Sequence, residues 1–170
     1  MDIKINKAKF ETFLGIAKNL NNFLDVIPIV YGSLGLYRII GERGECEDID
    51  ILIPNEFVNE RWSELVDVMA KMGLELENEH KREFISDSGT ISFLEQNDLI
   101  RRINLYPDTL IAHSINDIKF KELSAENYLA AYKFIVQDGH LREEKKKSYQ
   151  KKVDMIEEYI ENAHDENKRD

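Results

Sequence analysis

The segment Asp48–Ile53, with the sequence DIDILI, alternates acidic and aliphatic side chains and is followed by Pro54. Because successive side chains of a strand point to opposite faces, this pattern predicts a strand with its three isoleucines on one face. Asp48 and Asp50 then share the other face, about 7 Å apart. Acidic residues have a low strand propensity, and two on one face repel each other, so a cation is expected to compensate them. Two such carboxylates suit Mg²⁺, which binds through one or two carboxylates together with substrate phosphates.

A second feature lies upstream, where the apolar run Val26–Tyr31 leads directly into Gly32 and Ser33. The run predicts a short strand, and Gly32 permits a sharp turn and the close approach of a ligand. The residues that follow can begin a helix, whose free N–H groups attract phosphate, and Ser33 adds a hydroxyl donor. The pair therefore predicts phosphate binding, with a plain turn as the alternative.

The composition restricts the classes of function. A formal net charge of −10 argues against general nucleic-acid binding, because neutralising phosphates requires a basic surface. No apolar run approaches the roughly 18 residues of a membrane span, and the N-terminus lacks the apolar core of a signal peptide. The single cysteine, Cys46, fits a reducing compartment, and the histidines show no zinc-ligand spacing with it or with one another. We therefore expect a cytoplasmic protein without membrane association.

Periodicity predicts an α+β fold. Helical spacing of apolar residues predicts helices over residues 7–25, 55–72, 124–138 and 141–162. Strand-like patterns cover residues 74–79, 83–87, 90–95 and 101–106, with a hairpin turn at Ser88 and Gly89. We expect one domain over residues 1–170, with an α/β core over 1–110 and C-terminal helices over 120–163.

A strand, a Gly-Ser turn, a short helix and a strand carrying Asp-x-Asp, in this order, resemble the nucleotidyltransferase superfamily that includes DNA polymerase β. The chain looks most like the small aminoglycoside and lincosamide nucleotidyltransferases and the minimal nucleotidyltransferases of bacterial toxin–antitoxin pairs. The matching residues are Gly32, Ser33, Asp48 and Asp50, and the resemblance covers about residues 26–54.

The resemblance implies a mixed sheet flanked by helices and a role for each matching residue. Gly32 and Ser33 would hold the β- and γ-phosphates of ATP or another nucleoside triphosphate, and Asp48 and Asp50 would coordinate Mg²⁺ that bridges it. A hydroxyl acceptor, on a small molecule or a protein, would attack the α-phosphate with pyrophosphate leaving. Small members of the superfamily often complete the acceptor cleft with a second subunit, which makes a homodimer one expectation.

The resemblance also implies a third carboxylate from a later strand, acting as base and second metal ligand. In the expected strand over 101–106 the aligned residue is Asn104, whose amide cannot accept a proton at neutral pH. Glu95, at the end of a nearby expected strand, and Asp108 are the other candidates. If none serves, the chain is a catalytically degenerate nucleotide-sensing or partner-binding module, for example in a toxin–antitoxin pair. The sequence leaves both interpretations open.

Several cationic residues are candidates for binding the nucleotide. Arg38 follows the Gly-Ser turn, Arg43 lies in the next loop, and Lys133 flanks the apolar stripe of the expected 124–138 helix. The alternatives are surface ion pairs for the arginines, including with the two acids, and solvation for the lysine. The basic run between Arg142 and Lys152 is typical of a solvated helix face, and it can also receive phosphate.

Overall fold

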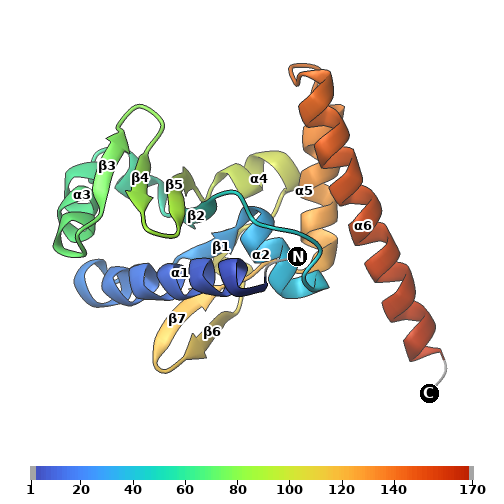
Figure 1. The fold of residues 1–170 in the computed structure, drawn as a ribbon, viewed down its shortest axis with the longest axis horizontal. Coiled ribbons are helices and arrows are strands. Elements are labelled where there is room, and N and C mark those ends of the chain that lie inside the picture. Colours follow the sequence, from blue (N-terminus) through green and yellow to red (C-terminus); the bar gives the residue numbers. More distant parts are fainter. Residues whose placement is uncertain (1–2, 169–170) are drawn as a thin grey trace.

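The computed structural model describes residues 3–168, which form a mixed seven-stranded sheet with helices on both faces (Figure 1). The order across the sheet is β3-β4-β5-β2-β1-β7-β6. The strands are β1 (Ile29–Tyr31), β2 (Ile49–Ile53), β3 (Glu75–Asn78), β4 (Glu83–Ser86), β5 (Gly89–Glu95), β6 (Ala112–Ile115) and β7 (Ile118–Lys121). The helices are α1 (Ile3–Leu24), α2 (Gly32–Ile40), α3 (Trp62–Lys71), α4 (Asp98–Ile103), α5 (Ala125–Gln137) and α6 (Glu143–Asn167), with 3₁₀ turns η1 (Asn55–Val58) and η2 (Pro107–Thr109). The expected α+β class, with a mixed sheet and a helical C-terminal region, is confirmed.

One row of four side chains crosses the centre of the sheet. Strand β2 runs antiparallel to β1 and parallel to β5, and β5 is antiparallel to β4. In this register Asp50 pairs with Tyr31 on one side and with Ser92 on the other, and Ser92 pairs with Glu83. Paired residues on adjacent strands point to the same face, so these four side chains lie side by side. We call Glu83–Ser92–Asp50–Tyr31 the polar row.

The opposite face of the same strands is apolar and is covered by α1 and α3. Trp62 of α3 packs on Phe84 of β4, which packs on Phe93 of β5, with ring centroids 5.6 and 5.7 Å apart. Phe13 of α1 packs edge-on against Phe120 of β7 at 5.8 Å. These four phenylalanines and Trp62 are all buried, so this face forms the main hydrophobic core.

A ladder of tyrosines joins the polar-row face to the C-terminal helices. Tyr31 stacks on Tyr128 of α5 at 6.0 Å, and Tyr128 stacks on Tyr132 at 6.2 Å. Tyr132 packs on Tyr149 of α6 at 5.6 Å. Figure 1 shows α5 and α6 side by side at one end of the molecule, away from α3. The ladder therefore sets the position of α6 relative to the end of β1.

The expectation of a strand over residues 101–106 is wrong. Helix α4 ends at Ile103, and Asn104 follows it in the left-handed conformation with φ 55°. Asp98 and Arg101 contact each other across one turn of this helix, which supports it. Asparagine is one of the few residues that adopt the left-handed conformation readily, so Asn104 marks a helix end.

Two further elements differ from the sequence-based expectations. The helix expected over 55–72 is divided into η1 and α3, because Asn59 leaves helical geometry (φ −123°, ψ −108°) and its side chain donates to the carbonyl of Asn55. The β6–β7 hairpin was not predicted, although its turn residues Asn116 and Asp117 have φ 50° and 67°, as type I′ turns require. Along residues 3–168, no helix is both long and apolar enough to cross a bilayer.

Candidate functional site

Gly32, the first residue of α2, lies directly against the carboxyl group of Asp50. Strand β1 ends at Tyr31, the partner of Asp50 in the β1–β2 ladder, so the start of α2 and the acid meet at one end of that ladder. Gly32 has φ 62°, and a Cβ atom added there would stand 3.0 Å from Cγ of Asp50 and closer still to its Oδ2. Glycine is required both by the backbone conformation and by the space. The fold thus brings together the Gly-Ser bend and one of the two acids expected to share a site with it.

The first turn of α2 is held in place by a second close approach. A Cβ atom at Gly35 would stand 2.8 Å from the carbonyl oxygen of Val30, to which the Tyr128 hydroxyl donates at 3.2 Å. The first turn of any helix leaves backbone N–H groups without intrahelical partners and carries the positive end of the helix dipole. Gly32 and Ser33 therefore present hydrogen-bond donors and partial positive charge beside the β2 acid.

Two buried polar side chains of α1 fix the loop that leads into β2. Asn6 accepts from the N–H of Cys46 at 2.9 Å and donates to the carbonyl of Gly44 at 2.8 Å. Lys9 donates to the Cys46 carbonyl at 2.6 Å. Both side chains are almost fully buried, at 3% and 5% exposure. The backbone that carries Asp48 into the strand is therefore anchored from the N-terminal helix.

Ser33 is half-buried beside the thiol of Cys46. Burial raises the pKa of Cys46, and a hydrogen bond with the Ser33 side chain partly opposes this. The Ser33 hydroxyl thus lies at the loop end that precedes the two acids.

Asp50 of β2 and Asp48, which directly precedes the strand, differ in exposure. Asp50 is half-buried, and its pKa is raised to about 6, first by burial and then by the charge of Asp48. Lys152 of α6 opposes this shift, while Glu83 and Glu47 add to it. Asp48 is exposed, and its pKa is raised by partial loss of solvent and by the charge of Glu47. A half-buried carboxylate among other acids gains strongly from a nearby cation.

Lys152 reaches this site from α6. Burial lowers the pKa of its ammonium group, while the charges of Glu47 and Asp50 act in the opposite direction. Its Nζ lies 5.5 Å from the ring centroid of Tyr132 and 5.3 Å from that of Tyr149, so two aromatic rings help to hold the ammonium group. In the sequence Lys152 is the last residue of a basic run that begins at Arg142. Its spacing of three from Tyr149, on the buried edge of α6, was the signal that separates it from the exposed lysines.

Two of the three cations expected at the phosphates form ion pairs with carboxylates of the fold. Arg38 donates to Glu122 at 2.7 Å, and Lys133 pairs with Glu157 of α6 at 3.2 Å. These partners give both side chains roles in joining elements of the fold. Arg43 is exposed in the loop between α2 and β2.

Glu95 and Asn104 do not join the polar row. Glu95 pairs with Ile53 in the β2–β5 ladder, so it points to the face opposite Asp50. Its carboxylate accepts from Asn59 at 3.1 Å on that side. Asn104 is exposed at the end of α4, and Asp108 is exposed in η2. None of these three residues is therefore a member of the polar row that contains Asp50.

The neighbour of Asp50 on β5 is a hydroxyl residue, Ser92. Glu83, one strand further, is the next carboxylate of the polar row, and its charge raises the pKa of Asp50. Glu83 was not predicted as a site residue, because its position depends on the register between β4 and β5, which no local pattern reveals.

The donor set fits a metal ion shared with a bound polyphosphate. Residues 3–168 contain no group of three or more His, Cys, Asp or Glu side chains placed to hold a metal ion by themselves. Asp50 and Asp48, which directly precedes β2, are near enough for the charge of Asp48 to raise the pKa of Asp50. Mg²⁺ needs only one or two carboxylates when substrate phosphates complete its coordination. The start of α2 at Gly32 packs directly against the Asp50 carboxyl group.

No protein-family model matches the chain. The chain is 33% identical over 153 residues to a protein of Bacillus subtilis (strain 168) named "Uncharacterized protein YnaI", covering 90% of this chain and 98% of that protein. A solved structure, that of the antibiotic-resistance factor ANT(2'')-Ia, aligns with a TM-score of 0.45 and 12% identity over 94% of this chain and 96% of that chain. A likeness of this size assigns neither an activity nor a substrate, so those have to be argued from the site.

Proposed function

The chain belongs to the same family as YnaI of Bacillus subtilis, a name that assigns no activity. From the site, we propose that the protein is a magnesium-dependent nucleotidyltransferase, which moves a nucleoside monophosphate from ATP or another nucleoside triphosphate to a hydroxyl acceptor. The resemblance of the Gly32-Ser33 and Asp48-x-Asp50 motifs to that superfamily motivates the proposal, and the geometry of the site supports it.

One observation carries the proposal: an acid, a helix start and a lysine that are far apart in the sequence meet at one place. Asp50 lies against Gly32 at the start of α2, and Lys152 of α6 is close enough to oppose the rise in the pKa of Asp50. A half-buried carboxylate beside positive groups on two sides suits a triphosphate together with its metal ion. A purely structural strand end requires none of these three features.

Each residue then has a defined task. The backbone N–H groups at Gly32 and Ser33, together with the Lys152 ammonium, would bind phosphate oxygens and hold the triphosphate. Asp48 and Asp50 would hold Mg²⁺, which supplies charge neutralisation on the phosphates when it is bound. Reactions of this class depend on positioning and electrostatic stabilisation more than on covalent help.

We assign Glu83 as the general base that accepts the proton of the acceptor hydroxyl group. In the transfer step the acceptor oxygen forms a bond to the α-phosphorus, and the bond from that phosphorus to pyrophosphate breaks. The acceptor O–H proton passes to the Glu83 carboxylate, directly or through Ser92 or a water molecule. Asp48 and Asp50 would hold the metal ion, and Glu83 is the other carboxylate of the polar row, so it is the one assigned to accept this proton.

Release of pyrophosphate tests the proposal. The protein is incubated with ATP, MgCl₂ and a panel of hydroxyl acceptors, and pyrophosphate and the AMP-bearing product are measured. We expect turnover by the unchanged protein, none with Asp50→Asn, and unchanged turnover with Asp67→Asn, an exposed acid of α3. Tight ATP binding without turnover on any acceptor would contradict the enzyme and leave a degenerate nucleotide-binding module.

Glu83→Gln separates the proton role from nucleotide binding. We expect kcat to fall about a hundredfold while Mg²⁺-dependent ATP binding is unchanged, because the lost group acts on the acceptor. Glu77→Gln, an exposed acid of β3, is the matched control. Equal rates for the two variants would contradict the role of Glu83.

A further inference from the structure

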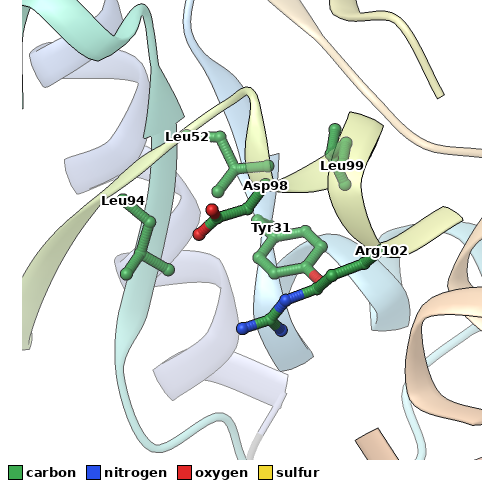
Figure 2. Close-up of a pocket in the computed structure, with 6 residues that line it drawn as sticks. All are labelled: Tyr31, Leu52, Leu94, Asp98, Leu99 and Arg102. Atoms are coloured by element: carbon green, nitrogen blue, oxygen red, sulfur yellow. The ribbon is translucent and has the colours of Figure 1, made fainter. Parts of the chain in front are cut away.

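A small cavity opens next to the polar row, between β2, β5 and α4. Figure 2 shows its lining: Leu52 and Leu94 from the strands, Leu99 from α4, and Tyr31 from the end of β1. Leu52 and Leu99 are each 2% exposed, so they form a dry floor. The cavity encloses about 50 Å³, room for a group of a few heavy atoms.

Two charged residues line the cavity, Asp98 and Arg102, and Arg102 has no carboxylate partner among residues 3–168. Its guanidinium group lies beside the ring of Tyr31 in Figure 2. Asp98, the acid that also lines the cavity, contacts Arg101 instead, and Arg101 also lies 3.6 Å from Glu95. Arg101 therefore pairs with both nearby acids, Asp98 and Glu95, and the charge of Arg102 stays available to a ligand.

The charges of Arg102 and Asp50 both act on two phenol groups, that of Tyr31, which lines the cavity, and that of Tyr149 of α6. Burial raises the pKa of Tyr31 and of Tyr149, the charge of Asp50 adds to both shifts, and the charge of Arg102 opposes both. Both hydroxyl groups therefore lie within electrostatic reach of a negative group on one side and a positive group on the other. A ligand seated here would meet an apolar floor, the Tyr31 side chain, the Arg102 guanidinium group and the Asp98 carboxylate, whose charge Arg101 offsets.

We propose that this cavity binds the acceptor substrate, and that the acceptor carries an anionic carboxylate or phosphate group and a small apolar group in addition to its reactive hydroxyl. The apolar group would sit on Leu52 and Leu99, the anionic group would receive hydrogen bonds from Arg102, and the hydroxyl would face Asp50. Guanidinium groups bind carboxylate and phosphate through paired hydrogen bonds, which fixes the orientation of the ligand. The role of this ligand as the acceptor substrate rests on the proposed function, whereas its chemistry is inferred from the residues that line the cavity.

The net charge of −10 does not oppose this assignment. Charges separated by more than about 8 Å are largely screened at physiological ionic strength, so a contact with Arg102 dominates over the distant acidic surface. The cavity should also discriminate against polycationic acceptors, because they would place positive charge against the Arg102 guanidinium group.

Three four-carbon probes of matched shape test the proposal: 3-hydroxybutyrate, butane-1,3-diol and 4-aminobutan-2-ol. They share a methyl and a hydroxyl group and differ only in carrying a negative, neutral or positive end. Binding is followed by chemical-shift changes of the Leu52, Leu94 and Leu99 methyl groups. We expect the anionic probe to bind at least about tenfold more tightly than the neutral one, and the cationic probe to bind most weakly.

Arg102→Gln should remove the preference for the anionic probe, whereas Lys147→Gln, which removes one exposed charge of α6, should leave it unchanged. Equal binding of the three probes, or a preference that survives Arg102→Gln, would overturn the proposal. A repeat in the presence of ATP and MgCl₂ identifies the source of the anionic group. Simultaneous binding supports an acceptor, and displacement of the probe by ATP would show that Arg102 belongs to the nucleotide site. Failure of ATP itself to bind would contradict the proposed function and leave the probe result standing.

Discussion

The two faces of the central sheet come from the same few strands and have opposite characters. On one face Ile49, Ile51 and Phe93 are sealed under α1 and α3, each at 1% exposure or less. On the other face Asp50 and Ser92 lie between those same residues along the chain, in a half-buried polar row. The alternation of the strand allows β2 to stabilise the fold and to carry the chemistry without either role disturbing the other.

Unlike the aliphatic residues of the other face, the Asp50 carboxylate lowers the free energy of unfolding. Its raised pKa, about 6, means that the folded protein holds this carboxylate less favourably than the unfolded chain does. Ile51, its neighbour, is stabilised by full burial. The two positions should therefore respond in opposite ways to the same kind of substitution, and the substitutions below test that contrast from the largest expected effect to the smallest.

Ile51→Asn should unfold the protein or nearly so. It removes a fully buried aliphatic side chain and places an amide in the apolar core, for a loss of about 4 kcal/mol in the free energy of unfolding. Urea denaturation measures this loss, and Ile51→Val, with an expected loss of about 1 kcal/mol, is the conservative control. Tolerance of asparagine at this position would contradict the assignment of a sealed face.

Gly32→Ala should lower stability by about 2–3 kcal/mol, because it adds a clash with Asp50 to the strain of a left-handed backbone. Gly41→Ala is the matched control, since Gly41 also has positive φ but would place its Cβ in open space. There the loss should be about 1 kcal/mol. Adding Asp50→Ala to Gly32→Ala should recover most of the difference. Equal losses at the two glycines would show that the acid does not press on the helix start.

Asp50→Asn should stabilise the metal-free protein at pH 8 by about 1–2 kcal/mol, a value reduced from the full pKa difference because the carboxyl group is partly exposed. The folded pKa of about 6 lies above the usual 3.8, so ionisation of Asp50 destabilises the folded protein. This destabilisation is absent below about pH 4 and complete above about pH 6. Unfolding in urea with EDTA at the two pH values measures it.

The stabilising effect of Asp50→Asn should therefore vanish at pH 4. Asp67→Asn, at an exposed position of α3, should change stability little at either pH. Destabilisation by Asp50→Asn at pH 8 would contradict the opposition between the two faces.

Lys152→Gln should weaken ATP binding about tenfold, because it removes a charged hydrogen-bond donor from the phosphates and leaves the sheet untouched. The neighbouring exposed Lys151→Gln removes the same charge at a different point of α6 and should have little effect. Titration calorimetry compares the two. Similar affinities would remove Lys152 from the site.

The parts of this molecule that could be read from the sequence are those set by local periodicity. The alternation in DIDILI predicts both faces of β2, and the apolar run before Gly32 predicts the bend that follows it. The strand predicted over residues 101–106 is wrong, because so short a segment fits a strand or a helix equally well. Its first three residues belong to the helix α4. Lys152 and Glu83 could not be assigned with confidence by pattern, because their positions depend on how α6 packs and on the β4–β5 register.

Calorimetric titration of ATP, with MgCl₂ and then with EDTA, into the unchanged protein and Asp50→Asn tests most directly whether the β2 acids and the α2 start form one nucleotide site. The unchanged protein should bind ATP tightly only with Mg²⁺, and Asp50→Asn should lose that dependence while keeping its circular dichroism spectrum. Mg²⁺-dependent binding at full strength in Asp50→Asn would contradict the site.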